Sequence, residues 1–217
     1  MSDMAELLLQ GLWDTLYMTI VSTVIAFLIG LPVGVVLIVT SKDGIRPNAA
    51  IHHTVGVIVN ILRSVPFLIL MIALIPFTRF VAGTTLGASA AVVPLVVASA
   101  PFVARLVESS LKEVDPGVVE AAQSMGATDW QIIWHVLLPE ARPSLVVQAV
   151  IAVTTILSYS AMAGIIGAGG LGDIASRYGY YRYQYDVMMV TVIILVIVVQ
   201  VFQEVGMRTA RHVDKRL

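Results

Sequence analysis

Three long stretches of the chain carry no charged side chain. Residues 15–41, 80–104 and 143–172 contain no Asp, Glu, Lys or Arg. Each stretch is longer than the run of about 20 residues that an α-helix needs to cross a hydrocarbon core of roughly 30 Å. The sequence therefore predicts an all-α, polytopic membrane protein. It excludes a soluble enzyme, a nucleic-acid-binding protein and a disordered chain.

Two weaker apolar segments join these three runs. Charged residues make up 12% of the chain, about half the share of a soluble domain. Residues 55–78 are apolar apart from Arg63, and residues 187–203 are uncharged. The acidic start lacks the basic region of a signal peptide, so the first apolar segment is expected to stay as a span. We expect one transmembrane domain, residues 1–217, with five spans at about 12–39, 55–77, 84–106, 144–165 and 187–206.

The basic residues are distributed unequally between the two sides. Ten of them fall in the 40–63 loop and helix start, the 105–142 segment and the tail, whereas Arg79, Arg177 and Arg182 fall on the other side. The positive-inside rule then places the N-terminus outside and the C-terminus in the cytoplasm of a bacterial inner membrane. The outer loop before the last span holds five of the seven tyrosines. It can be an interfacial aromatic belt or a docking surface for an external partner.

The polar stretch at residues 108–143 is predicted to form a cytoplasmic helical hairpin. Asp115-Pro116 is typical of a helix start, and Gly126 is typical of a helix C-cap. Thr128 and Gln131 form a capping box for a second helix, which we expect Pro139 to stop. Helices this short are marginal alone, so they must pack on something else. The partner is either the protein's own helices or another subunit.

One pattern within this hairpin points to a known family. The sequence Glu120-Ala121-Ala122, then Gly126, then Val136-Leu-Leu138-Pro139 resembles the EAA loop of ABC importer permeases, which docks in a cleft of the cytoplasmic ATPase. The family pattern has isoleucine where Val136 stands. The resemblance implies a role in ATPase coupling for seven residues: Glu120, Ala121, Ala122, Gly126, Ala127, Leu138 and Pro139.

The resemblance extends over essentially the whole chain. Arg63-Ser-Val-Pro66 resembles the start of the second helix in amino-acid permeases, and the segments at 75–79, 158–164 and 169–172 are similar to methionine importer permeases. The resemblance implies a permease that moves D- or L-methionine by alternating access. Its implied partners are a second copy of the chain, two ATPase subunits that bind ATP and Mg, and a periplasmic or lipid-anchored binding protein. Another amino acid or small polar solute is the alternative substrate.

The chain has no energy-coupling motif of its own. It lacks a Gly-x-x-x-x-Gly-Lys-[Ser/Thr] phosphate-binding loop. The middle of each proposed span lacks the Asp or Glu that usually marks ion coupling. Uphill transport would therefore need energy from a partner bound at the hairpin. An ATP-independent channel or facilitator, with the hairpin as a cytoplasmic cap, is the competing hypothesis.

A few residues within the spans are candidates for the transport path. Ser158, Tyr159 and Ser160 give the fourth span a polar face, which suits a water-accessible path or interhelical hydrogen bonds. Met162 follows them, and the family resemblance places it near a gate, with ordinary packing as the alternative. Arg63 either snorkels to the cytoplasmic interface or has a role in a gate or in helix pairing, and with Pro66 it can mark a helix start. The sequence alone does not lead us to expect Arg63 to be a substrate ligand.

Other motifs favour no chemistry. Residues 167–172 formally match the dinucleotide fingerprint, but they follow a membrane span rather than a strand, so we expect a sharp turn with close backbone packing. The histidines at 52, 53 and 135 lack the spacing of a metal site. We therefore expect no cofactor, no metal and no catalytic centre in this chain, and a membrane-embedded enzyme is the least favoured hypothesis.

Overall fold

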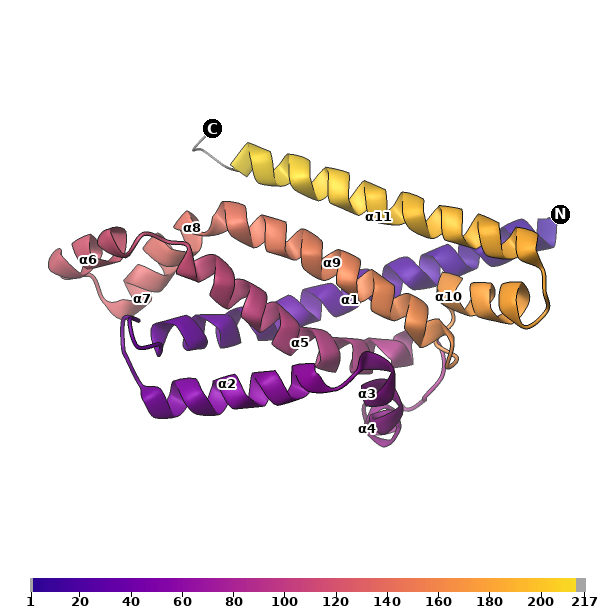
Figure 1. The fold of residues 1–217 in the computed structure, drawn as a ribbon, viewed down its shortest axis with the longest axis horizontal. Helices are drawn as coiled ribbons and strands as arrows, with labels where there is room; N and C mark the ends of the chain where they lie inside the picture. The colour runs from indigo at the N-terminus through magenta and orange to yellow at the C-terminus, as the bar shows by residue number, and fades with distance from the viewer. Residues whose placement is uncertain (1, 214–217) are drawn as a thin grey trace.

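The computed structural model describes residues 2–213, and all of its regular structure is helical. The long helices cross the molecule roughly side by side, and the hairpin lies at one end of them (Figure 1). Their bounds are α1 Ser2–Val39, α2 Ala49–Ser64, α3 Phe67–Ala73, α4 Ile75–Ala82, α5 Ala88–Lys112, α9 Arg142–Gly164 and α11 Tyr185–Val213. The hairpin consists of α6 Pro116–Ser124, α7 Asp129–Ile132, the π-helical turn η1 Ile133–Leu137 and α8 Leu138–Glu140. A corner between α9 and α11 is formed by α10 Gly170–Ile174 and the π-helical η2 Ala175–Tyr180.

Four helices in the described part of the chain are long and apolar enough to cross a membrane. They cover Met4–Val39, Ala88–Lys112, Arg142–Gly164 and Tyr185–His212. The shortest has 23 residues, which corresponds to about 35 Å. The prediction of an all-helical membrane protein is confirmed.

The second span was predicted as one helix over residues 55–77, and the structure differs from this prediction. The helix begins earlier, at Ala49, and ends at Ser64, where the chain turns by 97° into α3. Val65 adopts an extended conformation with ψ 124°, as expected for a residue before proline, because the proline ring disfavours helical backbone there. Asn48 caps the start of α2 by accepting a hydrogen bond from the Ile51 N–H. This part of the chain is therefore a bent helix pair, which has the geometry of a broken span or of a re-entrant loop.

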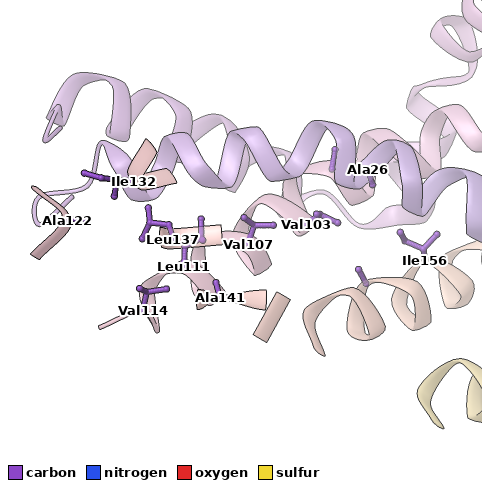
Figure 2. Packing of buried hydrophobic residues seen from close by; sticks show 12 residues of the cluster. Ala26, Val103, Val107, Leu111, Val114, Ala122, Ile132, Leu137, Ala141 and Ile156 are labelled. Carbon is purple, nitrogen blue, oxygen red and sulfur yellow. The ribbon is translucent and has the colours of Figure 1, made fainter. Parts of the chain in front are cut away.

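The most deeply packed span is α5, which lies between α1 and α9 (Figure 1). Of its apolar window 61% of residues are buried, against 11% for α11. Val103 and Val107 of α5 lie against Gly30 and Gly34 of α1, and Figure 2 shows them in one row of core residues with Ala26 of α1 and Ile156 of α9. Because α11 packs mainly along α9 and η2, most of its surface remains open to lipid or another subunit.

The corner after α9 depends on close backbone contact. A Cβ at Gly172 would lie 2.0 Å from the Ala161 carbonyl oxygen, and one at Gly164 would lie 2.3 Å from the Asp173 nitrogen. Thr15 of α1 fixes the same corner, since its hydroxyl oxygen accepts from the Leu171 N–H at 2.9 Å. The expected sharp turn with close backbone packing is what the structure has at residues 167–172, where Gly167, Gly169 and Gly170 have positive φ.

Replacing Gly172 with alanine should destabilise the protein. The added methyl group meets backbone atoms of α9, which cannot move without separating α10 from that helix. We expect the thermal unfolding midpoint of the detergent-solubilised protein to fall by several degrees. Gly56→Ala is the matched control, because a Cβ there makes only an ordinary contact, 3.5 Å from Arg105 Nη2, and alanine favours a helix interior over glycine by about 1 kcal/mol. An unchanged midpoint for Gly172→Ala would contradict the packing argument.

Candidate coupling hairpin and transport path

The first helix of the hairpin begins and ends as its sequence predicts. The Asp115 carboxylate accepts from the Gly117 N–H at 2.8 Å, and Pro116 occupies the first helical turn. At the other end, Gly126 has φ +80°. The Gly126 N–H donates to the Gln123 carbonyl and the Ala127 N–H donates to the Ala122 carbonyl. This pair of bonds is the Schellman arrangement, which needs a left-handed residue at position 126.

The second arm starts with the predicted capping box but does not stop at Pro139. Thr128 and Gln131 cap each other's backbone N–H groups. After Ile132 the backbone widens into η1, where the Leu138 N–H bonds to the Ile133 carbonyl, five residues back. Pro139 then lies in the first turn of α8, where a missing N–H leaves no bond unmade. The prediction that Pro139 ends the helix is therefore wrong, because the π-helical turn accommodates the proline.

One side of the hairpin is part of the protein core. Ala122, Ile132 and Leu137 are at most 5% exposed and pack with the C-terminal end of α5 (Figure 2). Ala127 and Leu138 pack against the same cluster while half-buried. An ion pair between Arg46 and Asp129 ties α7 to the loop after α1. The hairpin is thus held by its own chain, as one of the two sequence-based hypotheses requires.

The other side of the hairpin is exposed and unusually apolar. Glu120, Ala121 and Gly126 are exposed, and Pro139 is half-buried. Large apolar side chains accompany them: Val118 (41% exposed), Met125 (82%), Trp130 (67%) and Trp134 (48%). The two tryptophan rings lie 5.5 Å apart. Together these four apolar residues form what we call the hairpin crown. The sequence analysis did not single out these four residues, because it selected hairpin residues by their match to the family pattern.

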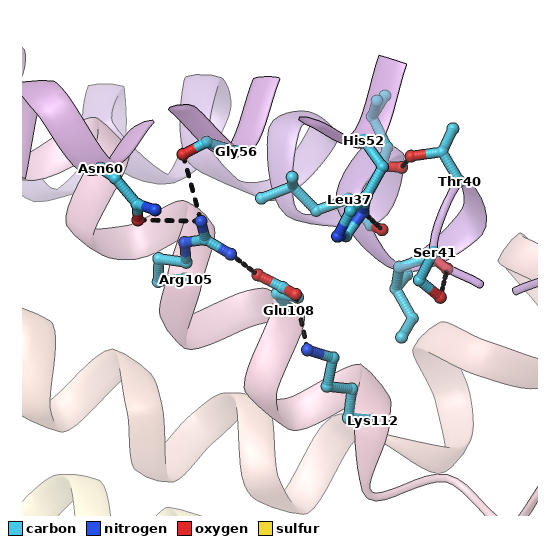
Figure 3. Close-up of polar contacts among 11 residues, drawn as sticks. Leu37, Thr40, Ser41, His52, Gly56, Asn60, Arg105, Glu108 and Lys112 are labelled. Atoms are coloured by element: carbon cyan, nitrogen blue, oxygen red, sulfur yellow. Dashed lines mark hydrogen bonds and ion pairs between the residues drawn. The ribbon is translucent and has the colours of Figure 1, made fainter. Parts of the chain in front are cut away.

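A cluster of charges lies beside the hairpin, where α2 meets α5. Glu108 is only 3% exposed. Its two carboxylate oxygens accept from Arg105 Nη1 at 2.6 Å and Lys112 Nζ at 2.7 Å. Arg105 Nη2 also donates to the Gly56 carbonyl at 3.2 Å and to Asn60 Oδ1 at 2.9 Å (Figure 3). The cluster therefore fastens α2 to α5. The sequence does contain a signal for this cluster, because opposite charges stand three and four residues apart on one helix. The sequence analysis did not single it out.

The candidate path residues on α9 do not share one surface. Ser158 and Met162 line an open, mostly apolar groove of about 730 Å³ between α9, the α10–η2 corner and α11. Tyr159 points elsewhere and stacks on Phe67 of α3, with ring centroids 4.5 Å apart and planes within 6°. Ser160 is 1% exposed and donates to the Leu157 carbonyl. The Ser158 hydroxyl likewise donates within its own helix, to the Thr154 carbonyl. Of the four candidates, Ser158 and Met162 thus face an open groove and the other two do not.

Arg63 and Pro66 flank the bend between α2 and α3. Arg63 is the penultimate residue of α2, and Pro66 immediately precedes α3. Pro66 therefore does mark a helix start. By the rise of an α-helix, Arg63 lies about 21 Å from the beginning of α2 at Ala49, so its side chain is far from the loop that precedes this helix. Snorkelling to an interface stays a prediction for this residue.

The described residues contain no cluster of three or more His, Asp or Glu side chains that could hold a metal ion. His52 Nδ1 lies 3.0 Å from the Leu37 carbonyl oxygen, and His135 Nδ1 lies 3.2 Å from the Gln131 carbonyl oxygen. Both rings thus contact backbone carbonyls of nearby segments, which is an ordinary structural role.

Comparison with known proteins identifies the class. Residues 26–217 match the family described as binding-protein-dependent transport system inner membrane component, and the chain belongs to this family. It is the permease subunit of an ABC importer.

Particular relatives resemble the chain over nearly its whole length. The chain is 51% identical to a protein of Vibrio cholerae described as probable D-methionine transport system permease protein MetI, over 98% of this chain and 94% of the relative. It is 53% identical to the D-methionine transport system permease protein MetI of Escherichia coli K12, over 74% of each chain. A solved structure described as an inward-facing conformation of the MetNI methionine ABC transporter matches with a TM-score of 0.98 and 50% identity. That match covers 99% of this chain and all of the other.

Replacing Glu108 with alanine should loosen the contact between α2 and α5. The variant leaves the largely buried Arg105 without its carboxylate, and removing one partner of a buried ion pair costs about 3 kcal/mol. We expect a lower thermal unfolding midpoint and faster proteolysis of the loop before α2. Glu204→Ala is the matched control, because Glu204 pairs with Arg208 at the exposed end of α11 and such pairs contribute little. Equal midpoints for the two variants would contradict the role of Glu108.

Proposed function

We propose that this permease forms the translocation path for methionine, in its D form, its L form or both, and that it works by alternating access. The relatives named above are methionine permeases by description, and the first of them matches nearly the whole length of the chain. The observation that carries the mechanism is the two-sided hairpin, with one face in the core and the crown of Val118, Met125, Trp130 and Trp134 exposed. An exposed apolar patch on a rigid element is the usual mark of a protein interface.

The crown is the docking surface for a cytoplasmic ATPase, with one ATPase on each of two permease copies. Glu120, Ala121 and Gly126 lie at the exposed surface and contact the ATPase directly, and Pro139 lies at its edge. Ala122, Ala127 and Leu138 support the hairpin from its buried side. ATP and Mg are bound by the ATPase, since this chain has no phosphate-binding loop. The permease itself is not catalytic.

The remaining partners follow from the orientation of the chain. The excess of basic residues around the hairpin, α2 and the tail favours a cytoplasmic location for that end. The N-terminus then lies outside, together with α4, the α10–η2 corner and the tyrosine-rich loop. A periplasmic or lipid-anchored binding protein delivers methionine to this outer side. The weakly buried faces of α2 and α11 leave ample surface for a second copy of the chain and for lipid.

Met162 acts at the gate of this path. It is 42% exposed on α9 and shares the groove with Ser158. A flexible and polarizable thioether can close an aperture and withdraw when helices rotate. Tyr159 and Ser160 contribute to the fixed wall behind it, since one is stacked on Phe67 and the other is buried.

Replacing Gly126 with aspartate should abolish coupling while leaving membrane insertion intact. A Cβ at this position meets nothing within 4 Å in the chain itself, so the new carboxylate projects into the ATPase interface. We expect ATP-driven methionine uptake by the reconstituted complex, and co-purification of the ATPase, to fall at least tenfold. Gly126→Asn is the matched control, because asparagine has nearly the same size and also tolerates positive φ. Full uptake by the aspartate variant would overturn the coupling assignment, whereas ATP-independent flux through the parent would indicate a facilitator.

Replacing Met162 with alanine should open a leak. Losing the side chain leaves a gap in the gate, so methionine-loaded proteoliposomes should lose substrate faster without ATP, or basal ATP hydrolysis should rise relative to uptake. The matched control is Met189→Ala, because Met189 is equally exposed (41%) but lies on α11. Unchanged leak and unchanged basal hydrolysis in the Met162 variant would remove this residue from the gate.

A further inference from the structure

Arg63 carries a positive charge beside the central part of a predicted span. It lies at the end of α2 (Ala49–Ser64) that is far from the cytoplasmic loop, and its guanidinium carbon is 6.0 Å from the centre of the Phe102 ring. Phe102 itself belongs to the central part of α5 (Ala88–Lys112), a helix long enough to cross the bilayer. By the helical rise, Phe102 lies about 15 Å from the Lys112 end of α5 and about 21 Å from its Ala88 end, so Arg63 lies beside the middle part of this helix.

This charge has no acidic partner in the part of the chain that the structure describes. The printed sequence contains no Asp or Glu between residues 49 and 104. Arg46, Arg105, Arg177 and Arg208 each pair with a carboxylate, whereas Arg63 is exposed and lies against the face of Phe102. An unpaired arginine facing lipid at the bilayer centre costs at least about 2.5–3.5 kcal/mol. Its side chain must therefore face water or another polar group.

The local structure connects Arg63 with the proposed path. The span breaks by 97° immediately after it, and broken spans near the bilayer centre are tolerated where they line a protein interface or an aqueous cavity. On the other side of the break, Phe67 stacks on Tyr159 of α9, the helix that also carries Ser158 and Met162. The break is thus joined to α9 on the side of that helix that faces away from the groove of Ser158 and Met162, so a path that includes Arg63 passes α9 on this second side.

We infer that the Arg63 guanidinium lies in the aqueous translocation path and interacts with the carboxylate of the passing amino acid. This inference rests on the proposed function and adds a chemical requirement to it, namely an anionic group on the substrate. A guanidinium matches a carboxylate in geometry and charge. Arg63 has no neighbouring acid and little other polar contact among the described residues. Its interaction with the substrate is therefore a single weak contact, which allows the amino acid to be released on the other side of the membrane. Selectivity among side chains is then left to the binding protein.

The first test compares Arg63→Gln with Arg63→Lys in proteoliposomes containing the complete importer. Methionine uptake per ATP hydrolysed should fall about tenfold or more in Arg63→Gln, since one charge-assisted hydrogen bond is lost, and by much less in Arg63→Lys. The parent importer must show ATP-driven uptake in the same assay. Failure of the parent would refute the proposed function, whereas equal uptake per ATP by the parent and both variants would refute only the role of Arg63.

The second test uses the absence of cysteine from the chain and an importer whose other subunits have been freed of reactive cysteines. Arg63→Cys should react with the water-soluble, anionic sulfonatoethyl methanethiosulfonate in membranes. Attaching an aminoethyl group instead should restore uptake, because it returns a positive charge, and the sulfonatoethyl group should not. Ile61→Cys is the matched control, because Ile61 is 60% exposed on the opposite side of α2 and should stay unlabelled and active. A thiol at position 63 that does not react, or equal recovery with both groups, would overturn the inference.

Discussion

The high cost of an unpaired charge in hydrocarbon organises this molecule. Charged side chains are absent from long stretches of three spans, and near the C-terminal end of α5 the buried Glu108 is paired with Arg105 and Lys112. With charge removed from the spans, packing depends on shape, and α5 becomes the buried centre between α1 and α9. The same constraint leaves a few exceptions, and these are the places where we propose function: the polar hairpin, the open groove on α9 and the single arginine at the break in the second span.

The hairpin combines two requirements that short helices rarely meet together. Its buried face, with Ala122, Ile132 and Leu137, draws stability from the end of α5, as helices of this length need. Its exposed face keeps two tryptophans and a methionine available to a partner. A surface that is preformed in this way loses little conformational freedom on binding, so more of the contact energy remains for association. The caps at Asp115, Gly126 and Thr128 fix its shape before any partner arrives.

Much of this architecture could be predicted from local sequence rules. Uncharged runs predicted the long helices, and the capping residues Asp115, Gly126 and Thr128 predicted the hairpin, because both features depend on neighbouring residues only. The rest depends on tertiary geometry. The break at Val65–Pro66 was hidden in an apolar run, and the passage of the helix through Pro139 required a π-helical turn that no local motif announces. The candidate path residues were grouped by proximity in sequence, but helical geometry sends Tyr159 and Ser160 away from Ser158 and Met162. The site assignments themselves stay predictions.

The π-helical turn η1 also has a mechanical consequence. From Asp129 to Gly164 the backbone is helical throughout, apart from the single turn residue Ala141. No flexible loop interrupts the route from Trp134 to the groove that holds Met162. A displacement imposed at the tryptophans would therefore pass to α9 through nearly continuous helix, and Ala141, which is buried against the end of α5, is the one residue on the way where the helix could change direction.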